Sequence, residues 1–520
     1  MRSKVVTAQE AAAKVPDGAL IGLSGVGPYG VALEVYDAVE ERFEKERHPA
    51  GISLIHSGGN MFTDKFAKDG MIKAYYSGLP NLDRDLMASN KFPIYSLSQG
   101  LVVQVYRAQA NDTPLLSKAG VNTFMDPRIE GGAANEKAKE SSIVEIVTVG
   151  GAEYLHYNLP PVTCAIIRAT TGDAEGNLVD FDEGIKFELL FLAMAVHNNG
   201  GVVIAQVKNL ARSGSLAGGD IKVPGMLVDY VVPCTDYGKW HFPEIDAPYS
   251  LGQTGFHKIE ESIIPFEEYA PKGERLVVVR RASEELRPGM VCNLGIGMPV
   301  GISYIVSQEG VQDLLHMSNE LGAIGGHLGG EMFFPTSFNA RAYLKHDEMF
   351  DFINGHGLDI TFLGAAEIGE DGSVNVTRIG GNIKGSGGFV NIASSTKKIV
   401  FISSHTIGGK LEIENGACKV AKPGKAGKFL KKVDQISFNG NDAARRGQEI
   451  SYITERAVFK LINGKLTLVE YAPGLDVEND ILAYMDFKPE VAKDLKPMPA
   501  YCFETGLIGM KEQWESINNK

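Results

Sequence analysis

Residues 17–28 read Asp17-Gly-Ala-Leu-Ile-Gly-Leu-Ser-Gly-Val-Gly-Pro28, and the chain returns to the same pattern at Pro288-Gly-Met-Val-Cys-Asn-Leu-Gly-Ile-Gly-Met-Pro299. Each copy has a turn glycine, an apolar stretch typical of a strand, then G-x-G and a proline. Each copy also follows a segment with helical spacing, Ala8 to Val15 in one case and Ala282 to Leu286 in the other. The pattern therefore predicts a helix, a strand and a glycine loop that occur twice.

A second pair of markers recurs in the same order. Gly172-Asp-Ala-Glu-Gly-Asn-Leu178 and Gly369-Glu-Asp-Gly-Ser-Val374 each follow an apolar strand-like stretch, Ala165 to Arg168 and Ile360 to Leu363. Two markers in one order predict two related halves. The first half is longer between its markers, so we expect an insertion around residues 60–150.

Short β-branched stretches between glycines indicate the fold class. They alternate with amphipathic segments, which is typical of α/β domains built on mostly parallel sheets. The stretches are Ile52 to Ile55, Val202 to Val207, Leu276 to Val279 and Lys398 to Ile402. We expect two similar open α/β halves, residues 1–257 and 275–520, joined by the charged, proline-bearing linker 258–274.

Composition narrows the function classes. A net charge of −13 disfavours an extended nucleic-acid surface, which needs clustered Lys and Arg. The five cysteines are scattered, odd in number and without a C-x-x-C pair, which fits free thiols in a reducing compartment. The start of the chain lacks a signal-peptide pattern, and the longest apolar run, Leu189 to Val196, is too short to span a bilayer. We expect a cytoplasmic protein with no membrane association.

The first glycine loop, Gly25-Val-Gly-Pro-Tyr-Gly30, matches G-x-G-x-x-G between a strand and the predicted helix Ala32 to Glu46. A dinucleotide site also requires an acidic residue after the next strand, whereas that strand ends in His56. NAD binding is therefore weakly supported, and close packing and ligand contact both remain open for these glycines. The chain has no G-x-x-x-x-G-K-[ST], H-E-x-x-H or G-x-S-x-G motif.

One carboxylate stands immediately before a run of glycines in Met317-Ser-Asn-Glu-Leu-Gly-Ala-Ile-Gly-Gly-His-Leu-Gly-Gly330. Such a run lets a ligand approach the backbone closely. A carboxylate such as that of Glu320, with a reference pKa of about 4.3, is ionised at neutral pH and would need no general base to act as a nucleophile. The alternative is a structural role, as a helix cap or in a salt bridge on a glycine turn. A second cluster, Gly380 to Gly388, is either an oxyanion site built from backbone donors or a long flexible loop.

These motifs resemble those of a known family. Glu320-Leu-Gly322 resembles the E-x-G motif of the family I coenzyme A transferases, and the setting is similar to the propionate or acetate CoA-transferase branch. Further landmarks of that branch cover nearly the whole chain: Tyr95-Ser-Leu-Ser-Gln-Gly100, Gly120-Val-Asn-Thr-Phe-Met-Asp-Pro-Arg128, Glu153-Tyr-Leu-His-Tyr157, Ala165-Ile-Ile-Arg168, Asn293-Leu-Gly-Ile-Gly-Met-Pro299, Gly385-Ser-Gly-Gly388 and Ala472-Pro-Gly-Leu-Asp476.

The resemblance implies an acyl-CoA:carboxylate CoA-transferase for short-chain fatty acids, with ping-pong kinetics through a glutamyl-CoA thioester at Glu320. Its fold would be two CoA-transferase halves with the active site between them, the N-terminal half serving the carboxylic acid. Its partners would be acyl-CoA and small carboxylic acids, with CoA as a substrate and no metal or ATP. We expect a homodimer or homotetramer.

The resemblance also assigns site residues. Gly388 would donate its backbone N–H to the oxyanion, and Gly387 would keep the loop close to the thioester. Gln99 would lie near the substrate carboxylate, although a turn residue bonded to backbone is an equal alternative. Gly295 and Gly297 would line the CoA channel. Lys431 or Lys432, before a predicted strand at 435–438, is either a contact for a CoA phosphate or an exposed pair.

The chain departs from the branch pattern beside the nucleophile. Asn319 precedes Glu320, and His327-Leu-Gly-Gly-Glu-Met-Phe-Phe334 replaces a Val-Pro-Ala-Gly-Gly type of stretch. These changes leave the identity of the acids open, together with the roles of Asn319, His327 and Glu331. Two other functions remain as alternatives: an acyl-CoA hydrolase on the same fold, and a non-catalytic acyl-CoA-binding protein.

Overall fold

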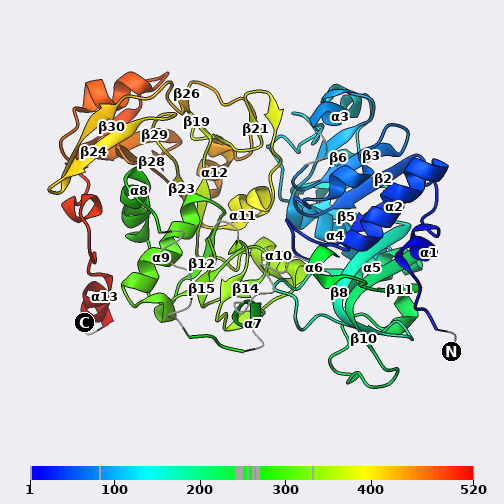
Figure 1. Ribbon diagram of the computed structural model, residues 1–520. Coiled ribbons are helices and arrows are strands. Elements are labelled where there is room, and N and C mark those ends of the chain that lie inside the picture. The colour runs from blue at the N-terminus through cyan, green and yellow to red at the C-terminus, as the bar shows by residue number, and fades with distance from the viewer. Residues whose placement is uncertain are drawn as a thin grey trace. The chain divides into compact units, whose positions relative to one another are not determined.

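The computed structural model describes residues 3–80, 84–240, 250–254, 257–260, 264, 270–330 and 333–518 (Figure 1). The chain divides into two compact units. Unit 1 comprises Met1–Phe256 with Leu344–Phe350 and Ile383–Asn391, and unit 2 comprises His257–Tyr343, Asp351–Asn382 and Ile392–Lys520. Two short segments of the C-terminal half therefore belong to unit 1. Much of the predicted linker lies outside the described residues.

Unit 1 is built on one parallel sheet. Its strands follow the order β11-β10-β8-β1-β2-β3-β4, and every neighbouring pair in that order is parallel. The short strand β9 pairs antiparallel with β8. The strands are β1 (Leu20–Leu23), β2 (Ile52–His56), β3 (Ile72–Ser77), β4 (Ile94–Ser96), β8 (Cys164–Asp173), β9 (Leu178–Val179), β10 (Val202–Ala211) and β11 (Tyr230–Pro233).

Helices cover both faces of this sheet because its central strands are apolar on both sides. Ile21 and Leu23 of β1 share a core with α1 and α2. Gly22 faces the other way, where an added Cβ would lie 2.4 Å from Leu192 of α5. The helices are α1 (Ala8–Ala12), α2 (Leu33–Glu46), α3 (Arg84–Ala88), α4 (Gln99–Ala110), α5 (Leu189–Asn198), α6 (Tyr237–Trp240) and α7 (Ser250–Gln253).

A small antiparallel sheet occupies part of the predicted insertion at residues 60–150. Its order is β5-β7-β6, from β5 (Leu115–Ser117), β6 (Val144–Val149) and β7 (Ala152–Tyr157). Together with β3, β4 and α4, this sheet accounts for the greater length of the first half between its markers.

Unit 2 has a ten-stranded sheet in the order β17-β14-β13-β12-β18-β23-β27-β28-β29-β30. Its strands are β12 (Val291–Leu294), β13 (His316–Ser318), β14 (Ala323–Ile324), β17 (Ala342–Tyr343), β18 (Ile360–Gly364), β23 (Lys398–Ile402), β27 (Glu449–Ile453), β28 (Ala457–Ile462), β29 (Lys465–Tyr471) and β30 (Glu490–Pro497). Smaller sheets join β15 (His327–Leu328) to β16 (Ser337–Phe338), β19 (Glu367–Gly369) to β20 (Val374–Asn375) and β26 (Phe429–Leu430), β21 (Arg378–Ile379) to β22 (Asn382–Ile383), and β24 (Lys410–Glu414) to β25 (Ala417–Lys422).

The helices of unit 2 are α8 (Glu274–Ser283), α9 (Gly301–Gln308), α12 (Gly440–Arg446) and α13 (Met510–Asn518). Two further helices, α10 (His346–Asn354) and α11 (Phe389–Ser395), have residues in both units. Among the described residues, no helix is long and apolar enough to cross a membrane.

The two units share a topology, which confirms the prediction of two similar α/β halves. The order β11-β10-β8-β1-β2 of unit 1 corresponds to β27-β23-β18-β12-β13 of unit 2, and all these pairs are parallel. The two copies of the repeated sequence form β1 and β12, which hold equivalent central positions. A repeat in the sequence is thus a repeat in the fold.

Two predicted strands are wrong. Leu276 to Val279 lies inside α8, where Val277, Val278 and Val279 are all buried. A short helix buried on several sides carries a continuous apolar run, which periodicity alone does not distinguish from a buried strand. Residues 435–438 form no strand, and Phe438 makes only an isolated bridge to Val374.

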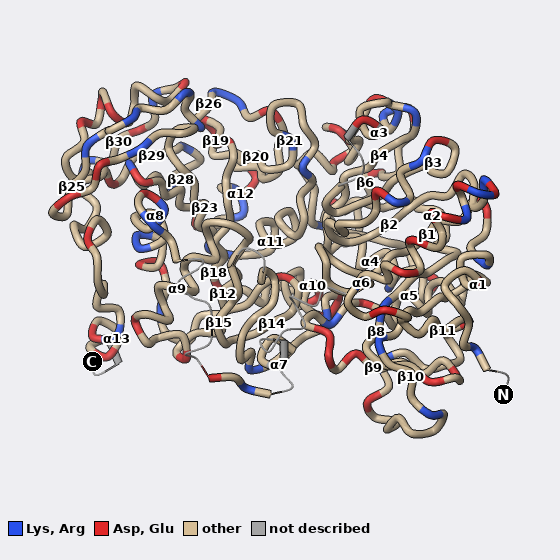
Figure 2. Tube along the Cα trace, in the orientation of Figure 1, with Lys and Arg blue, Asp and Glu red and all other residues tan. Residues whose placement is uncertain are grey.

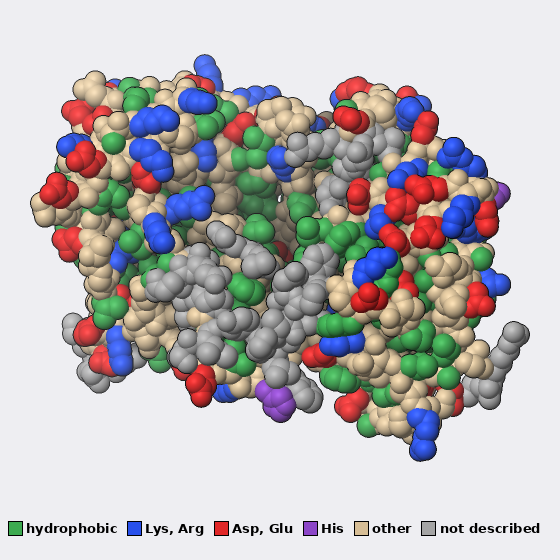
Figure 3. Space-filling view, viewed as in Figure 1, with side chains coloured by type: hydrophobic (Ala, Val, Ile, Leu, Met, Phe, Trp, Pro, Cys, Tyr) green, Lys and Arg blue, Asp and Glu red, His purple; other side chains and the backbone are tan. Residues whose placement is uncertain are grey.

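Charged residues of both signs alternate along the chain, as Figure 2 shows. On the face seen in Figure 3, basic and acidic side chains are interspersed. This face therefore presents charges of both signs rather than one broad basic patch.

Candidate functional site

Glu320 and the second G-x-G loop emerge side by side from the sheet of unit 2. The parallel pair β12–β13 places Asn293 opposite Ser318, so Gly295 and Glu320 each follow two residues later at the same edge. The N–H of Gly295 donates to the carbonyl oxygen of Phe362 in β18, at 3.0 Å. This is the carboxyl edge of a parallel sheet, where ligands of open α/β proteins bind.

A tight turn presents Glu320. The Gly322 N–H donates to the carbonyl oxygen of Asn319 at 3.2 Å, and the Leu321 N–H donates to Asn319 Oδ1 at 3.0 Å. Asn319 and Leu321 are buried, whereas Glu320 between them is partly exposed. Gly322 has φ +100°, a conformation that glycine adopts readily. Glu320 is therefore held in the loop between β13 and β14, and the helix-cap alternative is wrong.

Gly295 and Gly297, the glycines predicted to line the CoA channel, are glycines for different structural reasons. A Cβ on Gly295 would lie 3.2 Å from the carbonyl oxygen of Phe362, so the close approach to β18 favours glycine. Gly297 has φ +85°. Between them Ile296 is 68% exposed, which leaves an apolar side chain in solvent beside the turn of Glu320.

In unit 1, the loop 385–388 is joined to the carboxyl edge beside β3 and β4. The Gln99 N–H donates to the Gly387 carbonyl oxygen at 2.8 Å, and the Gly387 N–H donates to the Gly78 carbonyl oxygen at 2.8 Å. The Ser386 hydroxyl donates to the Leu97 carbonyl oxygen at 2.9 Å. This part of the second glycine cluster is therefore bound to the sheet edge rather than a free loop.

Two polar groups at this edge remain available to a ligand. The N–H of Gly387 is used, and that of Phe389 donates to the Ser386 carbonyl oxygen at 3.0 Å, but the buried Gly388 N–H makes no hydrogen bond in the described part of the chain. Gln99 is 3% exposed, and its Oε1 has no hydrogen-bond partner among the described residues. An unsatisfied buried polar group costs about 1–3 kcal/mol, a cost that a bound ligand can offset.

The predicted site residues thus form two sets, one in each unit. Unit 1 brings together Gln99, Gly387 and Gly388, and unit 2 brings together Glu320, Gly295 and Gly297.

A buried polar chain that sequence reasoning missed connects the segment 344–350 to unit 1. His346 Nδ1 lies 2.7 Å from Glu188 Oε2, and the Ser57 hydroxyl donates to Glu188 Oε1 at 3.2 Å. Both side chains of the His346–Glu188 pair are fully buried. Ser57 follows the last residue of β2, so this chain begins at the carboxyl edge of the sheet of unit 1. The three residues are far apart in sequence and form no local motif.

The three residues that depart from the family pattern, Asn319, His327 and Glu331, differ in their structural roles. Asn319 shapes the turn of Glu320, as described above. His327 is buried, and its Nδ1 lies 2.9 Å from the Ser307 hydroxyl of α9, which indicates a packing role. Glu331 lies outside the described residues.

Close packing explains the first glycine loop. A Cβ on Gly25 would lie 2.6 Å from the Tyr29 carbonyl oxygen, and one on Gly30 would lie 2.4 Å from Phe187. At the start of α2, Gln206 Oε1 accepts hydrogen bonds from the N–H groups of Glu34 and Val35, at 3.0 and 3.3 Å. A dinucleotide pyrophosphate would require such donors to be available. The packing explanation is therefore favoured over NAD binding.

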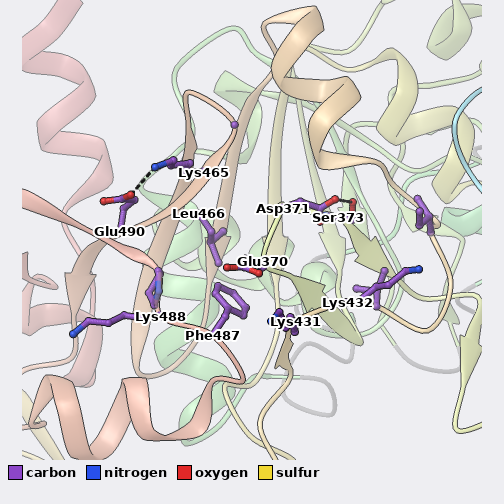
Figure 4. Close-up of a pocket in the computed structure, with 14 residues that line it drawn as sticks. Glu370, Asp371, Ser373, Lys431, Lys432, Lys465, Leu466, Phe487, Lys488 and Glu490 are labelled. Atoms are coloured by element: carbon purple, nitrogen blue, oxygen red, sulfur yellow. Dashed lines mark hydrogen bonds and ion pairs between the residues drawn. The ribbon is translucent and has the colours of Figure 1, made fainter.

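A cavity of about 810 Å³ in unit 2 is lined by Lys431 and Lys432, the two lysines considered as contacts for a CoA phosphate (Figure 4). Lys465 in its wall is paired with Glu490 at 2.8 Å. Lys465 is the first residue of β29. Because β29 runs antiparallel to β28, and β28 runs antiparallel to β27, β29 has the same direction as β27. This wall of the cavity therefore lies at the amino edge of the ten-stranded sheet, whereas Glu320 lies at the carboxyl edge. The lining residues are Glu370, Asp371, Ser373, Lys431, Lys432, Val433, Ile436, Gly464, Lys465, Leu466, Phe487, Lys488, Pro489 and Glu490.

Within the described ranges, no group of three or more His, Cys, Asp or Glu side chains is arranged to hold a metal ion.

Comparison with known proteins gives consistent similarities. A family model described as coenzyme A transferase matches residues 5–233 and 277–479. The chain is 38% identical over 533 residues to caffeate CoA-transferase of Acetobacterium woodii, covering 99% of both chains. It is 35% identical over 522 residues to acetate CoA-transferase YdiF of Escherichia coli O157:H7, covering 98% of this chain and 96% of the relative.

Solved structures agree. The crystal structure of the YdiF acyl-CoA transferase apoenzyme superposes with a TM-score of 0.90 at 34% identity, covering 98% of both chains. A second structure of that protein, described as a thioester complex with CoA, matches equally well.

Proposed function

The chain belongs to the coenzyme A transferase family and is a CoA-transferase, and from this premise we propose that it moves CoA between short-chain carboxylic acids through a thioester on Glu320. The observation that carries the proposal is the turn that leaves Glu320 partly exposed between two buried neighbours, at the carboxyl edge of the sheet and beside the Gly295 loop. A thioester complex with CoA described for the YdiF relative supports the same type of intermediate.

The first half of the proposed reaction forms the enzyme thioester. A Glu320 carboxylate oxygen attacks the carbonyl carbon of the acyl-CoA, the C–S bond breaks, and CoA leaves as a thiolate. The thiolate then attacks the glutamyl carbonyl of the mixed anhydride. The first acid leaves as its carboxylate, and Glu320 carries CoA.

The second half reverses these steps with the acceptor acid. Its carboxylate attacks the glutamyl thioester, CoA leaves and then attacks the new acyl group, and Glu320 regains its carboxylate. Charge and atoms balance at every step, and one thioester replaces another of similar energy, so the exchange requires no ATP. CoA is a substrate in this scheme.

Each tetrahedral stage places negative charge on one oxygen. We assign the Gly388 N–H as the donor to that oxygen, because it is buried and makes no hydrogen bond within the described residues. Loss of one such donor typically costs a factor of about 10²–10³ in rate. We assign the donor end of the Gln99 amide, Nε2, to the substrate carboxylate, since the side chain is buried and its backbone is fixed to Gly387.

The acids proposed are acetate and propionate, supported by the acetate CoA-transferase relative at 35% identity. The caffeate CoA-transferase relative, at 38% identity, favours an aromatic acid as the second candidate. A panel with butyryl-CoA as donor and acetate, propionate and caffeate as acceptors separates the two by their kcat/KM values.

The covalent route is tested by mass spectrometry of the Glu320 peptide after incubation with acetyl-CoA and borohydride. A CoA adduct or the reduced alcohol on Glu320 is expected, and Glu320→Gln should lose both the adduct and turnover. Glu320→Asp keeps the carboxylate but withdraws it by one methylene, so we expect at least about a 100-fold lower kcat. Full turnover with unmodified Glu320 would exclude the covalent mechanism.

The acyl-CoA hydrolase alternative is tested by the same preparation. From acetyl-CoA alone, a transferase releases at most one equivalent of acetate per site and keeps the CoA as the Glu320 thioester. With an acceptor acid the CoA leaves only as the new thioester, so no free CoA accumulates. Continuous CoA release without an acceptor would favour the hydrolase. Binding of acetyl-CoA with neither release nor transfer would favour the non-catalytic alternative.

A further inference from the structure

Asn319 holds the turn of the nucleophile at three points. Its carbonyl oxygen accepts from the Gly322 N–H at 3.2 Å, its Oδ1 accepts from the Leu321 N–H at 3.0 Å, and its Nδ2 donates to the Pro335 carbonyl oxygen. The first two bonds close a β-turn with an Asx-turn inside it, both of which fix the backbone of Glu320.

The third bond connects the turn to another part of the chain. Pro335 precedes Thr336, whose carbonyl oxygen accepts from the Gly329 N–H at 2.9 Å, and the neighbouring Ser337 hydroxyl donates to the Gly325 carbonyl oxygen at 2.7 Å. The segment 335–337 is therefore itself fixed to the glycine-rich residues 322–330 that follow Glu320. Through Nδ2, Asn319 joins the nucleophile's turn to this fixed segment.

The burial of Asn319 restricts which side chains can make these contacts. Asn319 is fully buried, so each of its amide atoms needs a partner inside the protein. The Leu321 N–H and the Pro335 carbonyl oxygen are partners for Oδ1 and Nδ2, respectively. No side chain without both a donor and an acceptor satisfies both contacts in the same place.

We infer that Asn319 is a positioning residue for the CoA-transfer reaction, which keeps the Glu320 carboxylate in attacking geometry by bridging its turn to Pro335. The inference rests on the proposed role of Glu320 as nucleophile. Misplacement of a reacting group by about 1 Å costs on the order of 100-fold in rate. Because Asn319 acts on Glu320 rather than on CoA, its loss should lower kcat and leave acyl-CoA binding unchanged.

Three variants test this role. Asn319→Ala removes both side-chain bonds, and we expect kcat to fall about 100-fold with the KM for acetyl-CoA within about twofold. Asn319→Ser has a hydroxyl that accepts from the Leu321 N–H but does not reach Pro335. Its kcat should therefore be about 10-fold higher than that of Asn319→Ala and still below that of the wild type. The dissociation constant of acetyl-CoA, measured in the Glu320→Gln background, should be equal with and without Asn319→Ala.

Asn135 supplies a matched control in unit 1. Its Oδ1 accepts from the N–H groups of Ala138 and Ile94, at 3.0 and 3.1 Å, and its Nδ2 donates to the Phe92 carbonyl oxygen at 2.9 Å. Ile94 starts β4, so this clamp lies at the amino edge of its sheet. Asn135→Ala should lower the melting temperature and leave kcat within about twofold.

A kcat of Asn319→Ala within twofold of the wild type would overturn the inference, as would an equal kcat loss in Asn135→Ala. If Asn319→Ala does not fold, the folded Asn319→Ser variant tests the inference instead. A wild-type kcat in Asn319→Ser would also overturn the positioning role of Asn319. Full activity of Glu320→Gln would instead remove the proposed function itself, so the two failures are distinguishable.

Discussion

The backbone N–H of Gln99 donates to the carbonyl oxygen of Gly387 at 2.8 Å, although the two residues come from opposite halves of the chain. Gln99 begins α4, and Gly387 belongs to the segment Ile383–Asn391 that packs within unit 1. The hydrogen bond fixes a candidate substrate-binding amide and a candidate oxyanion donor in one local structure. Each therefore has a separate test.

The Gln99 amide should be needed for the acid rather than for the fold. Gln99→Glu replaces the donor end of the amide with a carboxylate that repels the substrate carboxylate, and we expect kcat/KM for acetate to fall at least about 100-fold. Steady-state kinetics with varied acetate measures this. Gln9→Glu makes the same charge change on exposed α1 and should have no effect. Equal kcat/KM values for wild type and Gln99→Glu would contradict the role.

Gly387 should be needed for the conformation that presents the Gly388 N–H. Gly387 has φ +52°, and an added Cβ would meet no heavy atom within 4 Å, so Gly387→Ala introduces backbone strain without a clash. Left-handed backbone costs an L-residue about 1–2 kcal/mol. We expect kcat to fall at least about 10-fold as the loop relaxes.

The control for this substitution is Gly200→Ala, which has φ +69° and equally open space at the α5–β10 connection. Thermal melts should show similar losses of stability for both variants. Only Gly387→Ala should lose kcat; a comparable loss in Gly200→Ala would show that the effect is global.

Breaking a buried ion pair should destabilise unit 2. Arg281 of α8 makes two hydrogen bonds to Glu470 of β29, at 2.7 and 3.1 Å, and both side chains are buried. Arg281 also pairs with Glu285 at 2.9 Å. Arg281→Met therefore leaves the buried Glu470 carboxylate with only the exposed Lys496, at 3.7 Å, as a cation, which costs about 3–5 kcal/mol. Denaturant unfolding measures this loss. Arg275→Met, at an exposed position of the same helix, should change stability by less than about 0.5 kcal/mol.

The repeat was the most productive sequence signal. Because β1 and β12 each follow a helix and precede a glycine loop, their shared pattern predicted two halves of one topology, and the sheet orders confirm it. The strand at Lys398–Ile402 was predicted with the observed bounds. The helix predicted from Ala32 begins one residue later, at Leu33.

Features that depend on contacts distant in sequence were not predicted. The segments 344–350 and 383–391 belong to unit 1 through bonds such as His346–Glu188 and Ser386–Leu97, for which no local pattern exists. The resemblance drew attention to Asn319 as a departure from the family pattern, but its role depends on Pro335, a contact that follows from how the loop folds back. Periodicity failed at Val277, because a buried helix and a buried strand share an apolar run.

His56 should make the protein sensitive to acid. Its side chain is fully buried, with Nε2 2.6 Å from the Tyr75 hydroxyl, and burial lowers the pKa of His56 from 6.5 to about 4. Between these two values the folded protein keeps His56 neutral while the unfolded chain binds a proton. Stability is therefore complete above pH 6.5 and is lost as the pH falls from 6.5 toward 4.

The size of this loss follows from the two pKa values. Between pH 7.5 and pH 5, His56 should contribute a loss of about 2 kcal/mol in the free energy of unfolding. His56→Gln retains a polar side chain that does not titrate, so its stability should fall by about 2 kcal/mol less than that of the wild type over this interval. Denaturant titrations at the two pH values measure the difference. Exposed His316→Gln should follow the wild type, and a His56→Gln variant that also follows the wild type would show that His56 is not the acid-sensitive group.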